Sequence, residues 1–138
     1  MTTYNFIDNA HGSMLIEHED LLEMPRVLRK SNGDQVFRYC NFGGSFFDGR
    51  ITSAAFLSCR FAKIDWYWSS FIGALFENTR FTDCIFRGAN FAACRFVNCE
   101  MNNCQFEKDN LNGSCDFDDC QWFGGIIKNC SGLPKAIF

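Results

Sequence analysis

Residues 81–99 read FTDCIFRGANFAACRFVNC, and a phenylalanine stands at every fifth position of this stretch. The same spacing holds from residue 46 to residue 111, where every fifth residue is large and apolar. The residue two positions before each of these is small, except at Ile64 and Asp109. Neither the alternation of a strand nor the period of a helix fits this pattern. A fixed short repeat is typical of a solenoid.

The large residues of the repeat are the predicted structural core. They are Phe56, Phe61, Trp66, Phe71, Phe76, Phe81, Phe86, Phe91, Phe96, Met101, Phe106, Leu111, Phe117 and Trp122. The frame slips by one residue near Asn112 and Gly113, and an earlier slip lies between Phe42 and Ile51. The positions between the core residues are mostly polar and suit turns. The repeat therefore spans roughly residues 35–130.

The stretch at residues 81–99 resembles the pentapeptide-repeat family, whose units carry Leu or Phe at their centre. The resemblance implies an all-β fold, a right-handed four-sided parallel β-helix with four pentapeptides in each coil. It also implies that the central residue and the residue two before it both point inward. Residues twenty apart then stack at the strand spacing of about 4.8 Å, and the repeat region makes about five coils.

Both ends of such a solenoid need covering, because an open end is an edge for aggregation. Residues 1–34 are predicted to cap the N-terminal coil, and IEHEDLLEMPRVLRK at residues 16–30 reads as a short helix with a break at Pro25. Residues 131–138, SGLPKAIF, form a short apolar tail that folds back or meets a partner. Members of the family often pair through their C-terminal coils, so the resemblance implies a homodimer contact at this end.

The nine cysteines raise the question of a metal site, a disulfide framework or a redox function. They continue the small position of the repeat, and no two are closer than five residues, whereas structural zinc normally uses close pairs. Their odd number and the lack of a secretion signal argue against a disulfide scaffold. We interpret them as reduced thiols packed beside the phenylalanine rings. His11 and His18 lie outside any catalytic motif, so we expect no catalytic residue, no metal and no cofactor.

The charge balance limits the partners of the chain. It has 13 basic and 16 acidic residues, a formal net charge of -3, and therefore no broad basic surface for direct nucleic-acid binding. No stretch approaches the roughly 18 apolar residues that a membrane span needs. We expect a cytoplasmic protein that does not enter a membrane.

One group of outward aromatic residues is a candidate protein-binding patch. Tyr67 and Trp68 fall on outward positions, and Phe47 lies one coil away from Tyr67 in the same column. Grouped exposed aromatics are typical of interface anchors. The alternative is that the N-terminal segment folds over them as a lid.

Acidic residues gather toward the C-terminal coils. The candidate acidic patch consists of Glu100, Glu107, Asp116, Asp118 and Asp119. No base or nucleophile accompanies them, so we interpret the group as a surface for a basic partner. Asp109 is the one acid in an inward position, where an unpaired carboxylate would be costly. We predict that the chain bulges at Asp109 and turns its side chain outward.

These features favour a non-enzymatic protein-binding module that acts through the outer faces of the β-helix, and the resemblance implies a bacterial cell. A toxin-neutralising, immunity-like protein and a scaffold are two versions of this function. The alternative, implied by relatives that mimic DNA, is binding and protection of DNA gyrase, as in quinolone resistance. An enzyme is the least supported reading, because fold alone carries no function and no site accompanies it.

Overall fold

The corners of the coils are formed by residues in the left-handed conformation. The computed structural model describes residues 6–8, 14–21, 35–47 and 53–138. Two positions after a core residue, φ is usually positive, as at Asn78 (49°), Asp83 (53°) and Asn103 (55°). Asn and Asp tolerate this conformation better than most residues, because their short side chains bond to the nearby backbone. Each such residue turns the chain onto the next side of the coil.

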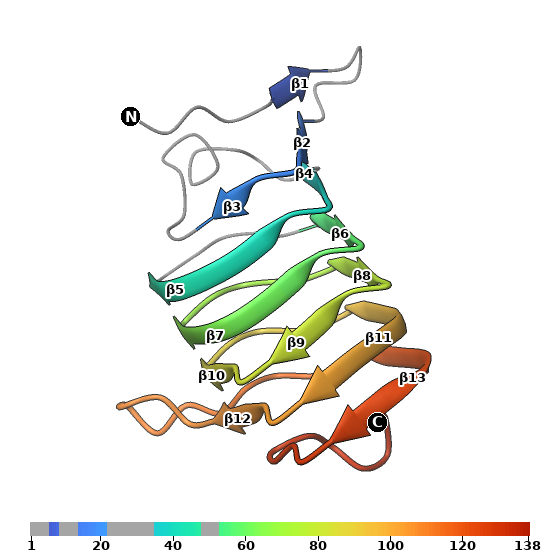
Figure 1. Cartoon of the computed structure of the whole chain (residues 1–138). Helices are drawn as coiled ribbons and strands as arrows, with labels where there is room; N and C mark the ends of the chain where they lie inside the picture. The colour runs from blue at the N-terminus through green and yellow to red at the C-terminus, as the bar shows by residue number, and fades with distance from the viewer. Residues whose placement is uncertain (1–5, 9–13, 22–34, 48–52) are drawn as a thin grey trace.

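Strands run along the sides of the coils, some of them continuing through a corner, and stack into layers (Figure 1). They are β1 (Phe6–Asp8), β2 (Met14–Glu17), β3 (Asp20–Leu21), β4 (Gln35–Arg38), β5 (Asn41–Phe47), β6 (Ala55–Leu57), β7 (Arg60–Tyr67), β8 (Leu75–Glu77), β9 (Arg80–Thr82), β10 (Ile85–Arg87), β11 (Arg95–Asn102), β12 (Gln105–Glu107) and β13 (Gln121–Lys128). Strands of successive layers pair in parallel, and only β1 pairs antiparallel, with β2, among the described strands. The predicted all-β parallel solenoid is therefore confirmed.

The interior is a lattice of phenylalanine rings. Phe56 is the register partner of Phe76, and Phe76 of Phe96, so one coil takes twenty residues. Within this column the rings are nearly parallel, with centroids 4.8 Å apart in both pairs. Rings of adjacent columns meet edge to face, as for Phe76 and Phe81 at 5.3 Å. Both arrangements are favourable for aromatic pairs, and each buried Phe contributes about 1.5–3 kcal/mol.

The number of turns is smaller than expected. Phe37, Phe56, Phe76, Phe96 and Trp122 occupy successive layers and mark about four turns in residues 35–130, where about five were expected. Part of the difference arises because six extra residues near the C-terminal coils leave the stack. No helix that could cross a membrane occurs among the described residues.

The helix predicted at residues 16–30 is wrong over the part that the structure describes. Residues 14–21 form β2 and β3, in which Ile16 and Leu21 are buried and pair in register with Phe37 and Phe42. Their five-residue spacing places both in core columns, and this tertiary packing outweighs helix propensity. The stack thus begins well before residue 35, and β1 covers the outer edge of β2. The remainder of that prediction, residues 22–30, lies outside the described residues.

Most of the predicted core is buried. The buried residues are Phe56, Phe61, Trp66, Phe71, Phe76, Phe81, Phe86, Phe91, Phe96, Met101, Phe106 and Phe117, and Trp122 is half-buried at the last coil. Leu111 is the error, because its side chain is 80% exposed. Phe117 takes the expected place of Leu111 and stacks on Phe91 with ring centroids 5.3 Å apart. Phe96 and Trp122 are register partners 26 residues apart, so the apparent slip of one residue is an insertion of six into the twenty-residue coil.

The cysteines are core residues that also donate hydrogen bonds. All nine are free thiols, and Sγ of Cys94 donates to the carbonyl oxygen of Phe71, one coil earlier, at 2.9 Å. Thr79 makes the same contact through Oγ1 to the carbonyl oxygen of Phe56 at 3.0 Å. The thiols of Cys40, Cys59, Cys84, Cys99, Cys104 and Cys115 do likewise. Burial raises the pKa of the Cys94 thiol to about 12, so it stays a protonated donor. The described part of the chain brings no three His, Cys, Asp or Glu residues into a metal-binding arrangement.

The C-terminal tail folds back across the last coil. The ring of Phe138 packs edge to face against Phe96 and Phe117, at centroid distances of 5.7 and 5.5 Å. The turn into the tail requires Gly132, whose φ is 85° and whose added Cβ would lie 2.0 Å from the carbonyl oxygen of Phe106. The chain's own tail therefore covers part of the end of the core, and the homodimer through this end stays a prediction.

Candidate protein-interaction surface

The six-residue insertion lies within residues 108–114, which form a loop organised by one carboxylate. Oδ1 of Asp109 accepts hydrogen bonds from the backbone N–H groups of Leu111 and Gly113, each at 2.8 Å. The N–H of Asp109 donates to the carbonyl oxygen of Gly113 at 2.9 Å. Such side-chain to backbone bonds stabilise a turn without a neighbouring strand. The predicted bulge at Asp109 is therefore present, and Leu111 lies at its centre.

Trp68 joins the loop to an earlier coil. Its indole Nε1 donates to Oδ2 of Asp109 at 2.8 Å, and its side chain remains 39% exposed. The corner imposes a φ of 53° on Trp68, a conformation that few large aromatic residues adopt. Hydrogen bonds, chiefly from the Gly113 amide, lower the pKa of Asp109. The carboxylate is thus ionised at neutral pH and holds both the loop and Trp68.

Two glycines leave room for this carboxylate. A Cβ added to Gly88 would lie 2.5 Å from Oδ2 of Asp109, and one added to Gly113 would lie 2.7 Å from it. Gly88 also has a φ of 58°, the left-handed conformation that glycine adopts without strain. A side chain at either position would displace Asp109.

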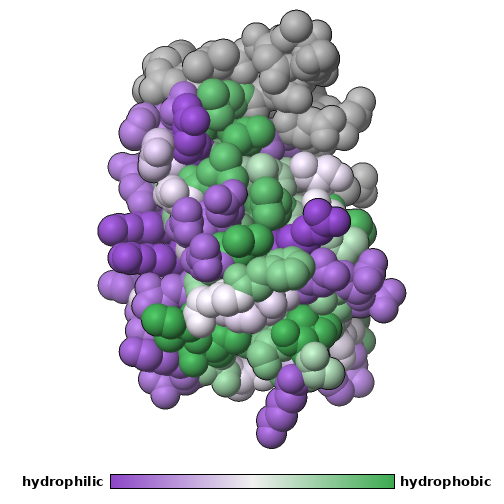
Figure 2. Space-filling model, turned by 90° about the vertical axis from the view of Figure 1, so that its right-hand side faces the viewer, coloured by the Kyte–Doolittle hydropathy of each residue, from purple (hydrophilic) through white to green (hydrophobic). Residues whose placement is uncertain are grey.

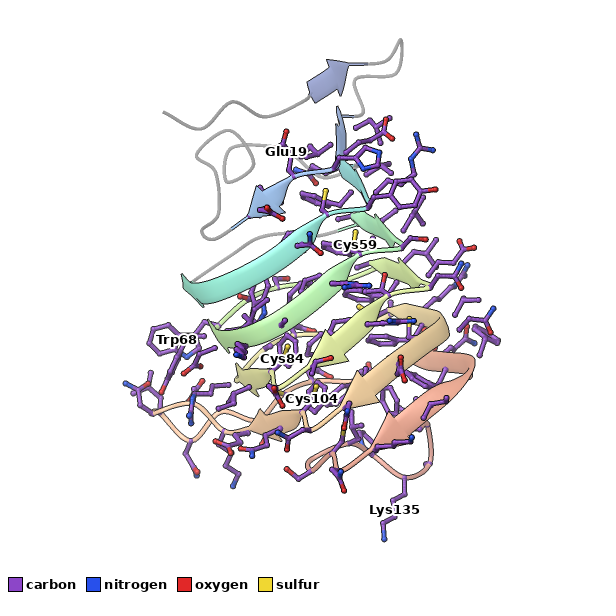
Figure 3. The ribbon with its side chains drawn as sticks, in the orientation of Figure 1. Glu19, Cys59, Trp68, Cys84, Cys104 and Lys135 are labelled. Atoms are coloured by element: carbon purple, nitrogen blue, oxygen red, sulfur yellow. The ribbon has the colours of Figure 1, made fainter. Side chains whose placement is uncertain are left out.

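The neighbouring aromatic corner is held by ion pairs. The rings of Tyr67 and Trp68 meet edge to face at 5.2 Å, and Cζ of Arg87 lies 5.7 Å from the centroid of Tyr67. Arg87 also pairs with Glu107 at 2.8 Å and with Asp65 at 3.4 Å. We call Tyr67, Trp68 and loop 108–114 the corner ridge, and Figure 3 shows Trp68 at this edge of the molecule, next to the loop that follows β12.

The predicted aromatic patch lies partly within the corner ridge. Phe47 and Tyr67 are register partners on β5 and β7, so they occupy one column. The side chain of Phe47 and most of the N-terminal segment predicted as the alternative lid lie outside the described residues. The binding role of the three aromatics stays a prediction.

The five predicted acids do not form one patch. Glu100 lies on β11 beside the Met101 column, Glu107 on β12 beside the Phe106 column, and the three aspartates surround Phe117 on a third side. Glu100 pairs with Arg80 at 3.3 Å, and Glu107 pairs with Arg87. Successive residues of a coil face different sides, so acids that are close in sequence separate in space.

A second apolar surface covers the side formed by β4, β6, β8 and the first half of β11. Figure 2 shows hydrophobic residues gathered in a band along this side, with hydrophilic residues beside it. Its members include Leu57, Leu75 and Val97, which are half-buried against their neighbours. Leu111 differs from them, because most of its side chain is in solvent.

Sequence reasoning missed Leu111 as a surface residue because it continues the five-residue period. The available signal was Asp109, which stands where a small inward residue is required. An acid at that inward position indicates that the five-residue period is broken at Asp109 and not three residues later, at Asn112. The partner of that acid, Trp68, is 41 residues away and no local pattern points to it.

Comparison with protein families agrees with the geometry of the coils. The family described as Pentapeptide repeats matches residues 69–107 in eight copies. Comparison with curated proteins gave no match. The matched residues lie within the regular layers, where a large residue and a small residue turn inward. Residues 69–107 are pentapeptide repeats, and the chain carries the repeat of that family, as its sequence predicted.

Proposed function

We propose that this protein is a non-enzymatic module that binds another protein through the corner ridge. The observation that carries the proposal is Leu111, which is 80% exposed on a loop held by the hydrogen bonds of Asp109. A leucine kept in water gains about 1.5–3 kcal/mol when a partner buries it. An apolar side chain presented in this way suits insertion into a pocket of another protein.

The rest of the corner ridge supports the same function. The loop is already ordered by Asp109, which reduces the entropy lost on association. Trp68 and Tyr67 add aromatic surface of the kind that dominates interface energetics. Leu111 and the two aromatic side chains supply mainly apolar surface, so the partner's contact region is expected to be an apolar pocket.

Two versions of this function fit the corner ridge. A toxin whose surface is occluded by the ridge would make the protein immunity-like. A scaffold that joins two proteins is the other version. Both place the protein in the cytoplasm of a bacterial cell, and neither requires a cofactor, a membrane or direct contact with nucleic acid.

Protection of DNA gyrase by imitation of DNA is the alternative. It requires a long, continuous acidic face, whereas Glu100 and Glu107 on the described coils are paired with Arg80 and Arg87. The corner ridge has no place in that mechanism. A supercoiling assay with gyrase tests it directly, and no effect at micromolar protein would remove it.

Affinity capture tests the corner ridge. Wild-type protein, Leu111→Asp and the control Ile72→Asp are used to capture proteins from bacterial extract, and the captured protein is then purified and titrated against each. Ile72 is 39% exposed on another side, so its substitution introduces the same charge away from the ridge. We expect at least about tenfold weaker binding by Leu111→Asp and little change in Ile72→Asp. Equal binding by the two variants would remove the corner ridge as the interface.

A further inference from the structure

Two arginines face each other on a different surface of the solenoid. Arg60 on β7 and Arg80 on β9 are register partners in the parallel sheet, and both side chains are exposed. Like charges directly opposite on neighbouring strands destabilise a sheet. This pair therefore has an unfavourable interaction that a bound anion would relieve.

The acids nearby compensate only one of the two arginines. Nε of Arg80 lies 3.3 Å from Oε2 of Glu100, one coil further along. On the other side of Arg60 lies Asn41, its register partner on β5. The side-chain Nδ2 of Asn41 donates a hydrogen bond to Oδ1 of Asp20 at 2.9 Å. No carboxylate in the described part of the chain forms an ion pair with Arg60.

The surface at the two arginines is hollowed. A hollow of about 240 Å³ is lined by Arg60, Phe61, Ala62, Arg80 and Thr82. A second hollow of about 420 Å³ adjoins it at Arg80 and is lined by Asn78, Arg80, Asn98, Cys99, Glu100, Gly125 and Ile126. Ala62 is the register partner of Thr82, and its small side chain leaves the space beside the two arginines open. The side-chain amides of Asn78 and Asn98 add further hydrogen-bond donors along the same surface.

We propose that Arg60 and Arg80 bind a carboxylate side chain from an acidic segment of a protein partner. A guanidinium group has five hydrogen-bond donors, and its planar shape matches that of a carboxylate. A second carboxylate between Arg60 and Arg80 would therefore form an ion pair like the one between Glu100 and Arg80. The adjoining hollow accommodates the neighbouring residues of the acidic segment. This arginine site shares no residue with the corner ridge and is argued independently of it.

A phosphate group is the other anion that a pair of arginines binds. Glu100 lies on the far side of Arg80, and its charge disfavours a dianion more than a single carboxylate. A surface pair of this kind, without a nest of backbone amides, is also a weak phosphate site. The ligand of the arginine site is therefore an acidic protein segment and not a phosphate group.

The test measures binding of a hexaglutamate peptide to the full chain by NMR titration at low salt. Hexalysine and pyrophosphate are titrated in parallel. The variants are Arg60→Gln and the matched control Arg95→Gln, which removes the same charge from an exposed residue on another side. We expect Arg60→Gln to weaken hexaglutamate binding about tenfold and Arg95→Gln by less than about twofold, with the largest shifts in Ala62 and Thr82.

A second readout separates binding from a role in the fold. Removing one of two opposed charges is expected to leave the melting temperature of Arg60→Gln unchanged or higher at low salt. Equal weakening by both variants would indicate nonspecific charge attraction and overturn the site. Tighter binding of pyrophosphate than of hexaglutamate, or a lower melting temperature in Arg60→Gln, would overturn it as well. None of these outcomes would alter the proposal for the corner ridge.

Discussion

The regular coils and loop 108–114 are held in shape by different interactions. In the coils, backbone groups bond to adjacent layers, as Arg80 N–H does to the carbonyl oxygen of Cys59 at 3.0 Å, and aromatic rings fill the interior. In the loop, the side chain of Asp109 replaces the adjacent layer, and the apolar residue Leu111 lies in solvent. The difference indicates that stability resides in the repeated layers, whereas the interruption supplies the exposed apolar surface that we propose for recognition.

The largest effect is expected from the core of the coils. Phe76 is fully buried and stacks between Phe56 and Phe96, so Phe76→Ala should lower the free energy of unfolding by about 3–5 kcal/mol. Glu77→Ala, the next residue and exposed, is the control and should change it by less than about 0.5 kcal/mol. Urea unfolding measures both. Equal losses would overturn the assignment of inward and outward positions.

A smaller effect is expected where a coil meets the loop. Gly88→Ala places a Cβ 2.5 Å from Oδ2 of Asp109 at a φ of 58°, and should destabilise the protein by about 1–3 kcal/mol through strain and displacement of the carboxylate. Gly73→Ala is the matched control, because Gly73 has a φ of 72° but its Cβ would lie 3.4 Å from the nearest atom, Oγ of Ser53. Gly73→Ala should therefore lose only the stability that backbone strain costs, without displacement of a neighbouring side chain. Equal melting temperatures for the two variants would mean that Asp109 is not held in place.

The loop should also respond to pH. The pKa of Asp109 is lowered in the folded protein, so its contribution to stability is present above the unfolded value of about 3.9 and is lost as pH falls through the folded value. Asp109→Asn lacks this charge, and its melting temperature should lie a few degrees below that of the wild type at neutral pH. The gap should narrow as the pH falls through the folded value. A gap that does not change with pH would show that the charge has no role.

The smallest effect on stability is expected at Leu111. Leu111→Ala should change the free energy of unfolding by less than about 0.5 kcal/mol, because the side chain is 80% exposed. Met101→Ala, at a buried core position, should lose about 2–5 kcal/mol in the same urea experiment. A large loss of unfolding free energy in Leu111→Ala would indicate that the Leu111 side chain is buried in the core, and would remove the proposed interface.

The fold was predictable because each repeat carries its sequence signal within five residues. Phe86 and Cys84 show the large and small inward positions within three residues, and the same pair recurs often enough to define the register. Ile16 and Leu21 have the same spacing but form only two repeats before residues 22–34 intervene. Too few repeats were present for the period to compete with a helical reading of the same residues.

The candidate site was less predictable because it depends on contacts between distant residues. Tyr67 and Trp68 were recognised as outward aromatics, but the role of Trp68 depends on Asp109, 41 residues later. The acids were recognised as a group, but the four-sided coil distributes them over three sides. Such features arise from the stacking of layers and not from the spacing within a layer.

The insertion of six residues has a consequence for how the molecule can vary. After the loop, Trp122 and Ile127 resume in register with Phe96 and Met101, so the angular phase of the last layer is the same as that of the layer before it. A corner can therefore accept a longer segment without rotating or shifting the next layer. We therefore expect that this loop can change in length and sequence while the layers remain unchanged, so an engineered segment at residues 108–114 should leave the register of Trp122 and Ile127 intact.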